Sequence, residues 1–307
     1  MDNRQIICRK HNLNFIRAFD TNERDPHKDV FLAQDINQKK VVVRTGECRS
    51  LNLLYSGYEG KFFKVPKLIY LDKEFPYEIE EFIDGKLLAD IIEQPTAKNF
   101  LDKKLQEKLL KAHFEFQAVC GPITLERKWD KREKLDKHFE KSKGLILQRD
   151  QAKEIIYGFD YEEYWSARYP AKWKFSMGNL ILMPNEKIGL IDLARAGLYF
   201  WGYDLGWVFW PLWFQMENKE YKKAKKHFKA LRNFFDRAYK FAPDFEQRQK
   251  EKFYKKCWLV AFERIIGSFY DMAEKIPHAE NIYKDEERKK LFLVFLNELM
   301  EYTLKKI

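Results

Sequence analysis

Residues 171–207, AKWKFSMGNLILMPNEKIGLIDLARAGLYFWGYDLGW, contain the pattern that decides the fold. Two short apolar runs flank the turn residues Pro184 and Asn185, and this arrangement predicts a β-hairpin. Asn179 precedes the first run and Asp192 follows the second, so an amide oxygen and a carboxylate are expected at one end of the hairpin. Mg²⁺ accepts both groups as ligands. Asn and Asp are also common in turns and helix caps, so the surrounding sequence is needed to distinguish a metal-binding role from a structural one.

The sequence before Gly85 is rich in strand patterns. Residues 13–46 contain three apolar runs separated by polar turns, which predicts an antiparallel meander. Residues 47–55 favour a helix after the break at Thr45-Gly46, and residues 64–72 and 76–83 predict two further strands. Asp84-Gly85 then ends the sheet-rich region.

Beyond Gly85 apolar residues recur every three or four positions, which predicts helices over residues 105–118, 219–241, 249–272 and 286–304. A five-stranded sheet with one helix, then a hinge, then a helical part carrying one hairpin, resembles the layout of protein-kinase-like folds. We therefore expect an α+β protein with a two-lobed protein-kinase-like fold. The expected N-lobe covers residues 1–83 and the expected C-lobe residues 84–307.

The composition is that of a folded protein, because 307 residues with 45% hydrophobic and 34% charged residues can bury a large core. No apolar run reaches the roughly 18 residues that span a bilayer, and the first residues show no signal-peptide core. We therefore expect a cytoplasmic location and no membrane partner. The cysteines are far apart in the sequence, which favours buried free thiols over disulfides or a zinc site: Cys8, Cys48, Cys120 and Cys257.

The net charge of +10 is concentrated in residues 219–256, which contain 14 Lys or Arg against 5 Asp or Glu. A basic surface of this kind attracts phosphate groups, nucleic acid or an acidic partner. The same segment carries apolar residues at helical spacing, so its basic residues are also explained as the solvated face of an amphipathic helix. Both interpretations stay open at this point.

Residues 178–205 resemble the signature of the aminoglycoside phosphotransferase and choline kinase family. That signature consists of H-G-D-x-x-x-x-N, a strand, a turn, I-D-[FWL], a small residue with Gly, and Y-D-L. The matching segments here are Gly178 to Leu182, Ile191 to Leu193, Ala196-Gly197 and Tyr203 to Leu205. The resemblance implies ATP-dependent phosphorylation of a small molecule with a hydroxyl group, with Asn179 and Asp192 as the Mg²⁺ ligands.

The resemblance extends into the sheet-rich region. Arg44 lies at the end of the third strand pattern, where the family has a cation that reaches the phosphates of ATP. Glu47 begins a segment that matches the family's N-lobe helix, and EFIDG at residues 81–85 resembles its hinge. The resemblance implies that Arg44 and Glu47 serve the phosphates and that the backbone of Glu81 and Ile83 holds the adenine.

The chain departs from the family pattern where catalysis depends on it most. Lys174 lies five residues before Asn179, at the position of the family's catalytic Asp, and a charged ammonium cannot accept a hydroxyl proton. The loop at residues 20–29 contains no glycine, so backbone amides cannot approach phosphates closely there. Three hypotheses follow: an impaired or inactive pseudokinase, an active phosphotransferase with relocated catalytic groups, and a binding protein for an acidic partner or nucleic acid.

Aromatic residues are frequent after the hairpin: Tyr199, Phe200, Trp201, Tyr203, Trp207, Phe209, Trp210, Trp213 and Phe214. Core packing explains them, and an aromatic wall for a planar or cationic substrate is the alternative. We expect Asp204 to anchor the loop at residues 175–178 by hydrogen bonds. His113 is expected to be a structural histidine with satisfied hydrogen bonds.

Overall fold

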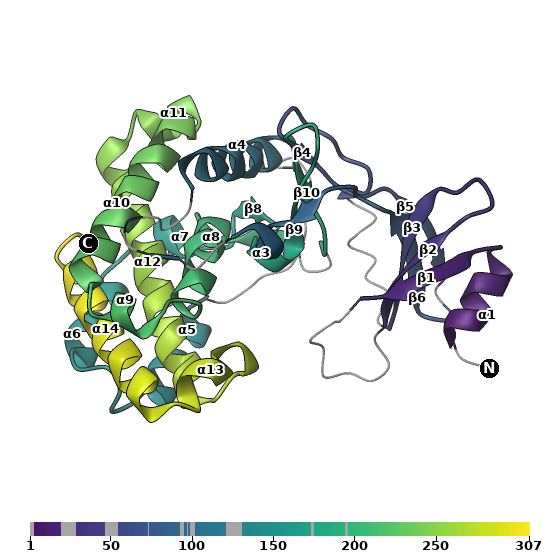
Figure 1. Ribbon diagram of the computed structural model, residues 1–307. Helices are drawn as coiled ribbons and strands as arrows, with labels where there is room; N and C mark the ends of the chain where they lie inside the picture. Colours follow the sequence, from purple (N-terminus) through teal and green to yellow (C-terminus); the bar gives the residue numbers. More distant parts are fainter. Residues whose placement is uncertain are drawn as a thin grey trace.

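The computed structural model describes residues 3–19, 29–46, 55–72, 74–92, 95–96, 98, 102–120, 131–172, 175–193 and 196–307. A sheet-rich lobe occupies one end of the molecule, a larger helical lobe occupies the other, and short strands join them (Figure 1). The expected two-lobed α+β architecture, with an antiparallel sheet followed by a mostly helical part, is confirmed. The lobe boundary at residues 83 and 84 stays a prediction.

The first sheet has the strand order β1-β2-β3-β6-β5, and all its neighbouring strands are antiparallel. Its strands are β1 Asn14–Ala18, β2 Val30–Gln34, β3 Lys40–Thr45, β5 Leu68–Asp72 and β6 Tyr77–Glu81. One face packs on helix α1, Asn3–Lys10, through a cluster that includes Val43, Ile79 and Ile7. Because side chains alternate across a strand, the neighbouring residues of β3 and β6 point to the opposite face.

A second sheet joins the two lobes, with the strand order β4-β10-β9-β7. Its strands are β4 Phe63–Lys64, β7 Lys86–Leu87, β9 Leu180–Leu182 and β10 Ile188–Leu190. The predicted hairpin is confirmed as β9 and β10, and it is paired on both sides. Gly85, with a φ of +148°, lies so close to it that an added Cβ would be 2.4 Å from the Leu182 carbonyl oxygen.

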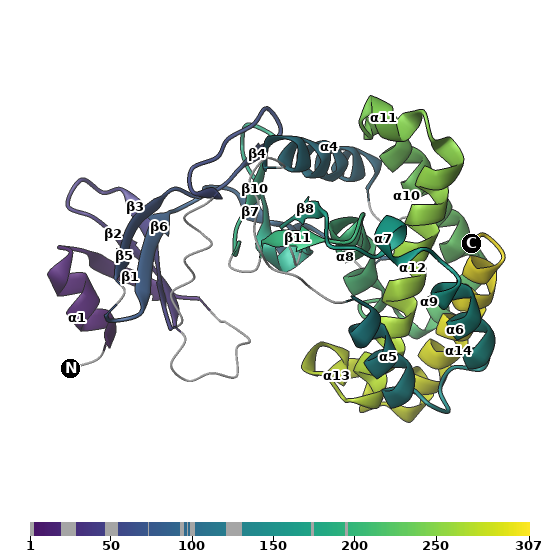
Figure 2. The same ribbon diagram turned by 180° about the vertical axis from the view of Figure 1, so that it is seen from behind.

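Among the described residues, six longer helices build the helical lobe: α4 Lys103–Cys120, α5 Lys131–Lys141, α8 Tyr203–Trp213, α10 Ala224–Phe241, α12 Lys250–Ala273 and α14 Glu286–Leu304. Helix α12 runs through the lobe and contacts α5, α8, α10 and α14, as both views show (Figures 1 and 2). Shorter elements complete it: α3 Leu88–Ile91, α6 Arg149–Tyr157, α7 Tyr161–Tyr164, α9 Asn218–Tyr221, α11 Asp244–Gln247, α13 Glu280–Tyr283, and the two-stranded sheet of β8 Tyr169–Ala171 and β11 Gly197–Tyr199. Within the described ranges, no helix is both long and apolar enough to cross a membrane.

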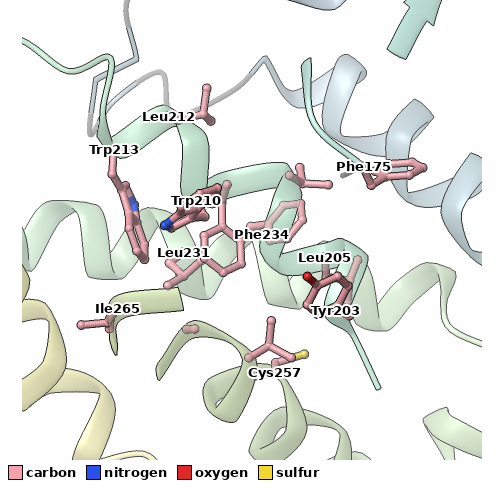
Figure 3. Close-up of a cluster of buried hydrophobic side chains, with 14 of the residues drawn as sticks. Phe175, Tyr203, Leu205, Trp210, Leu212, Trp213, Leu231, Phe234, Cys257 and Ile265 are labelled. Atoms are coloured by element: carbon pink, nitrogen blue, oxygen red, sulfur yellow. The ribbon is translucent and has the colours of Figure 1, made fainter. Parts of the chain in front are cut away.

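Helix α8 lies in the core of the helical lobe and is apolar around most of its circumference. Phe209, Leu212 and Trp213 are at most 1% exposed. Figure 3 shows Trp213 and Leu212 in the same cluster as Leu231 and Phe234 of α10 and Ile265 of α12. Core packing therefore explains most of the aromatic residues after the hairpin.

One sequence expectation is changed by the structure, and another is not tested by it. The helix expected over residues 219–241 is two helices, α9 and α10, because the chain leaves helical geometry at Lys222-Lys223. The buried carboxylate of Glu220 contacts Lys223 and His227 across this break. The helix expected over residues 47–55 lies outside the described residues except for Tyr55.

The free thiols agree with the sequence analysis. Cys8, Cys120 and Cys257 are buried and form no disulfide, whereas Cys48 lies outside the described residues. Burial raises the pKa of the Cys120 thiol to about 12, so this thiol stays protonated and unreactive at neutral pH.

Candidate functional site

The register of the β9–β10 hairpin brings Asn179 and Asp192 to one end of it. Leu180 is paired with Leu190, and the Ile191 N–H donates to the Asn179 carbonyl oxygen at 3.2 Å. The two residues therefore lie on adjacent chain segments, as the turn pattern predicted. Asp192 has a φ of +56°, a left-handed conformation that costs on the order of 1 kcal/mol even for Asp. The fold thus holds this carboxylate where a free chain would rarely place it.

Arg44 lies on the face of the first sheet that is opposite α1, together with two acidic residues of β6. Glu78 is directly across the ladder from Arg44, and Glu80 is two residues farther along the same strand face. The Arg44 Nε donates to Glu80 Oε1 at 2.7 Å and lies 4.0 Å from Glu78 Oε1. Both carboxylates are buried, and the Arg44 side chain is 23% exposed.

Asp192 lies beside this group, because it lines the same small recess as Glu80. Burial by itself lowers the pKa of a guanidinium, but the charges of Glu80, Asp192 and Glu78 together raise the pKa of Arg44 above its ordinary value. The arginine of the N-lobe sheet is therefore attracted to the acid at the end of the C-lobe hairpin. Arg44, Glu80 and Asp192 form one charged group between the lobes, which we call the interlobe site.

The recess beside this group is small. It is lined by Val65, Pro66, Leu68, Glu80, Asp192 and Leu193, and its volume is about 10 Å³. A space of this size holds about one water molecule. Glu80 and Asp192 therefore border a space that has little room beyond one water molecule.

The donor set at the end of the hairpin suits Mg²⁺ only in part. Asn179 and Asp192 supply one amide oxygen and one carboxylate, and Mg²⁺ is commonly held by one or two carboxylates together with phosphate oxygens and water. No group of three or more His, Cys, Asp or Glu that could hold a metal occurs among the described residues. The metal-binding role of the two residues stays a prediction that requires phosphate oxygens to complete the coordination.

Lys172 and Asp204 hold the segment that leads into the hairpin. Asp204 is fully buried, and its Oδ2 accepts a hydrogen bond from the Lys172 backbone N–H at 2.7 Å. The Lys172 side chain is also fully buried, with its Nζ 3.5 Å from the Asp192 carbonyl oxygen. Asp204 therefore does anchor this segment, at a residue slightly earlier than the expected 175–178.

His113 is buried beside this anchor. Its Nδ1 lies 3.9 Å from Asp204 Oδ2, and burial lowers the pKa of the imidazole to about 3. The ring is therefore neutral at physiological pH. The structural role agrees with the expectation, but neither ring nitrogen has a hydrogen-bond partner among the described residues, so the expected satisfied histidine is wrong in that respect.

The hinge is packed tightly against the hairpin. Ile83 is 3% exposed, and a Cβ added at Gly189 would be 2.7 Å from its Cγ2. The Glu81 N–H donates to the Lys67 carbonyl oxygen at 2.8 Å, and its carboxylate accepts from Lys64 Nζ at 2.6 Å. The role of the Glu81 and Ile83 backbone in holding adenine stays a prediction. The Glu81 N–H cannot donate to an adenine while it donates to the Lys67 carbonyl oxygen.

Two of the predicted site residues, Lys174 and Glu47, lie outside the described residues. The described acids that bind Arg44 are Glu80 and Glu78, which the sequence analysis did not single out. A signal for them exists, because acids at 78 and 80 alternate with Tyr77 and Ile79 and must therefore share one strand face. No comparable pattern in the sequence indicates that the Lys172 side chain is buried.

The aromatic wall considered for a cationic substrate contains a cation of the chain itself. The Arg264 guanidinium lies over the rings of Tyr203, Trp207 and Trp210, at 5.3, 5.6 and 5.4 Å from their centroids. It also binds the neighbouring Glu263 carboxylate through two nitrogens. The side chain of Arg264 therefore makes the cation–π contacts that a cationic ligand would need from these rings.

Comparisons with known proteins give matches at the level of structure. No family model matches the sequence, and no curated protein matches it. An aminoglycoside phosphotransferase from Alicyclobacillus acidocaldarius is similar with a TM-score of 0.60 and 12% identity, over 98% of this chain and 94% of that one. A complex of aminoglycoside phosphotransferase APH(4)-Ia with ADP and hygromycin B is similar with a TM-score of 0.56 and 10% identity, over 100% of this chain and 99% of that one. An ethanolamine kinase from Plasmodium vivax is similar with a TM-score of 0.52 and 11% identity, over 100% of this chain and 86% of that one.

These similarities span nearly the whole chain, and the identities are low enough that they establish the fold alone. The protein therefore has the protein-kinase-like fold of aminoglycoside phosphotransferases and small-molecule kinases, in agreement with the resemblance seen in the sequence.

Proposed function

We propose that this chain is a small-molecule kinase homologue in which phosphoryl transfer is impaired or absent. The fold and the placement of Asn179 and Asp192 at one end of the hairpin support a kinase-like site. The observation that carries the impairment is the 2.7 Å bond from Arg44 to Glu80. It ties the cation expected to reach the phosphates to a buried acid of its own sheet.

Electrostatics explains why this bond opposes ATP binding. Transfer from ATP needs cations at the phosphates and gains little from covalent chemistry. If Arg44 turned towards a phosphate, Glu80 and Glu78 would remain buried without their cation, and breaking a buried ion pair in this way costs about 3–5 kcal/mol. Asp192 attracts the same guanidinium, so Arg44 also competes with a metal ion for that carboxylate.

Lys174 adds a second reason for impairment. A positioned general base contributes roughly 10²–10⁴-fold to rate, and the residue at this position is a lysine. ATP and Mg²⁺ would then bind weakly, with Asn179 and Asp192 as the protein ligands of the metal. A small molecule with a hydroxyl group remains the partner that the fold suits, and it would be bound without efficient transfer.

The test is ADP release by the full chain with ATP, Mg²⁺ and a panel of amino sugars, choline and homoserine. We expect rates equal to the background of the same mixture without protein. Release above background that the substitution Asp192→Ala abolishes would instead establish an active phosphotransferase with relocated catalytic groups. The variant Asp244→Ala, changed at an exposed acid, serves as the matched control.

A further inference from the structure

The outer face of α10, together with Lys222 just before it, carries a row of exposed cations that we call the basic stripe. It consists of Lys222, Lys225, Lys226, Lys229, Arg232 and Lys240, all of them exposed. Most of their spacings are three or four residues, so they share one side of the helix. The opposite side is buried against the lobe through residues that include Ala224, Leu231 and Phe235.

One acid shares the stripe's side of α10, because Asp236 lies four residues from both Arg232 and Lys240. Between Lys222 and Lys240 the only acidic residue is Asp236, which accepts a hydrogen bond from the Tyr254 hydroxyl at 2.8 Å. Glu220 and Glu246 are 2% and 5% exposed and bind their own partners inside the lobe. Within the described part of the chain, no stripe residue has a carboxylate within salt-bridge distance.

The stripe is long, straight and lies far from the interlobe site. Helix α10 has 18 residues and is therefore about 27 Å long. Figures 1 and 2 both show it on the side of the helical lobe that is farthest from the first sheet. Binding at the stripe is therefore separable from binding at the interlobe site.

The absence of exposed apolar groups restricts the class of partner. No large hydrophobic side chain is exposed between Lys222 and Lys240, and the nearest exposed aromatic residue, Phe245, lies beyond the end of α10. Protein interfaces need buried apolar or aromatic anchors, membrane-surface helices need an apolar face, and single-stranded nucleic acids need aromatic rings on which bases stack. A duplex needs none of these, because its phosphates are bound by cations alone.

We propose that the basic stripe binds the phosphodiester backbone of a nucleic-acid duplex without reading its sequence. A helix of about 27 Å laid along a duplex faces about 8 base pairs, so each stripe cation can reach a phosphate. With five or six such contacts, the logarithm of the binding constant falls with the logarithm of the salt concentration with a slope of about −5.

The experiment measures the binding of the full chain to labelled duplex DNA and duplex RNA of about 30 base pairs between about 50 and 200 mM salt. We expect binding that weakens about 10³-fold over this range. The triple variant Lys225→Gln, Lys226→Gln and Lys229→Gln should flatten the slope by about 2.7, because each phosphate contact contributes about 0.9. Glutamine keeps the helix propensity of lysine, so α10 is retained.

The matched control is Lys284→Gln, Lys289→Gln and Lys305→Gln, which removes the same charge from lysines already bound to Glu280, Glu286 and Glu301. It should leave the salt slope unchanged. The proposal is overturned if no duplex binds at low salt, or if both variants weaken binding equally. It is also overturned if only polyglutamate, single strands or phosphatidylserine vesicles bind. A preference between DNA and RNA identifies the source of the duplex.

Discussion

The interlobe site and the basic stripe are two regions of one chain whose cations have opposite surroundings. In the interlobe site, Arg44 is attracted to Glu80, Glu78 and Asp192, all provided by the chain itself. On the stripe, the cations are exposed, and the one acid on the same side of α10, Asp236, accepts a hydrogen bond from the Tyr254 hydroxyl. The contrast teaches that the number of basic residues does not identify an anion-binding surface. The placement of the acids relative to the cations does.

The largest expected effect comes from removing the cation of the interlobe site. Arg44→Met leaves Glu78 and Glu80 buried without their cation and should lower the free energy of unfolding by about 3 kcal/mol. Arg232→Met, the same change on the stripe, should alter it by less than about 0.5 kcal/mol. Urea denaturation of both variants measures the difference, and equal losses would remove the contrast between the two regions.

A second, smaller effect concerns pH and the buried His113. The folded-state pKa of about 3 lies below the ordinary value of 6.5, so the unfolded chain takes up a proton first as the pH falls. The stability contributed by the neutral ring is therefore present above pH 6.5 and is lost progressively down to pH 3. Between pH 7 and pH 5 the loss should be about 2 kcal/mol.

The variants His113→Gln and His278→Gln test this prediction by denaturation at both pH values. His113→Gln should reduce the loss between the two pH values by about 2 kcal/mol, whereas His278→Gln, at a histidine with a 43% exposed side chain, should leave that loss in place. If the wild type and His113→Gln lose the same stability between the two pH values, His113 is not the group responsible.

The smallest expected effect is a change in stability that has opposite signs in the two triple Lys→Gln variants. The triple Lys→Gln variant of the stripe removes like charges at helical neighbour positions, so it should stabilise the protein slightly at low salt, by less than about 0.5 kcal/mol per pair. The control at Lys284, Lys289 and Lys305 loses ion pairs and should be slightly destabilised. Thermal unfolding at low and high salt measures both, and the two differences should vanish as salt screens the charges.

The sequence predicted those parts of the fold that local chemistry decides. The turn at Pro184-Asn185 set the hairpin, and through it the placement of Asn179 and Asp192. The alternating runs of residues 13–46 gave the meander of β1, β2 and β3. Helix α14 was predicted because apolar residues at helical spacing run along its whole length.

Other parts could not be predicted from local patterns. Helix α5 was missed because its sequence is mostly charged, and α8 because it is apolar on nearly every side and contains Pro211. The bond from Arg44 to Glu80 depends on the register of β3 against β6, which joins residues 36 positions apart. The burial of the Lys172 side chain likewise depends on packing that no local pattern reveals.

The most direct test of the account compares ATP affinity, in the presence of Mg²⁺, between the wild type and Glu80→Gln, with Glu74→Gln at an exposed acid as the control. Glutamine removes the charge that ties Arg44, so calorimetry should find ATP bound at least about tenfold more tightly, a gain of about 1.4 kcal/mol. Unchanged or weaker binding by Glu80→Gln, in a variant that unfolds like the wild type, would contradict the claim that the chain's own acids keep Arg44 from the phosphates.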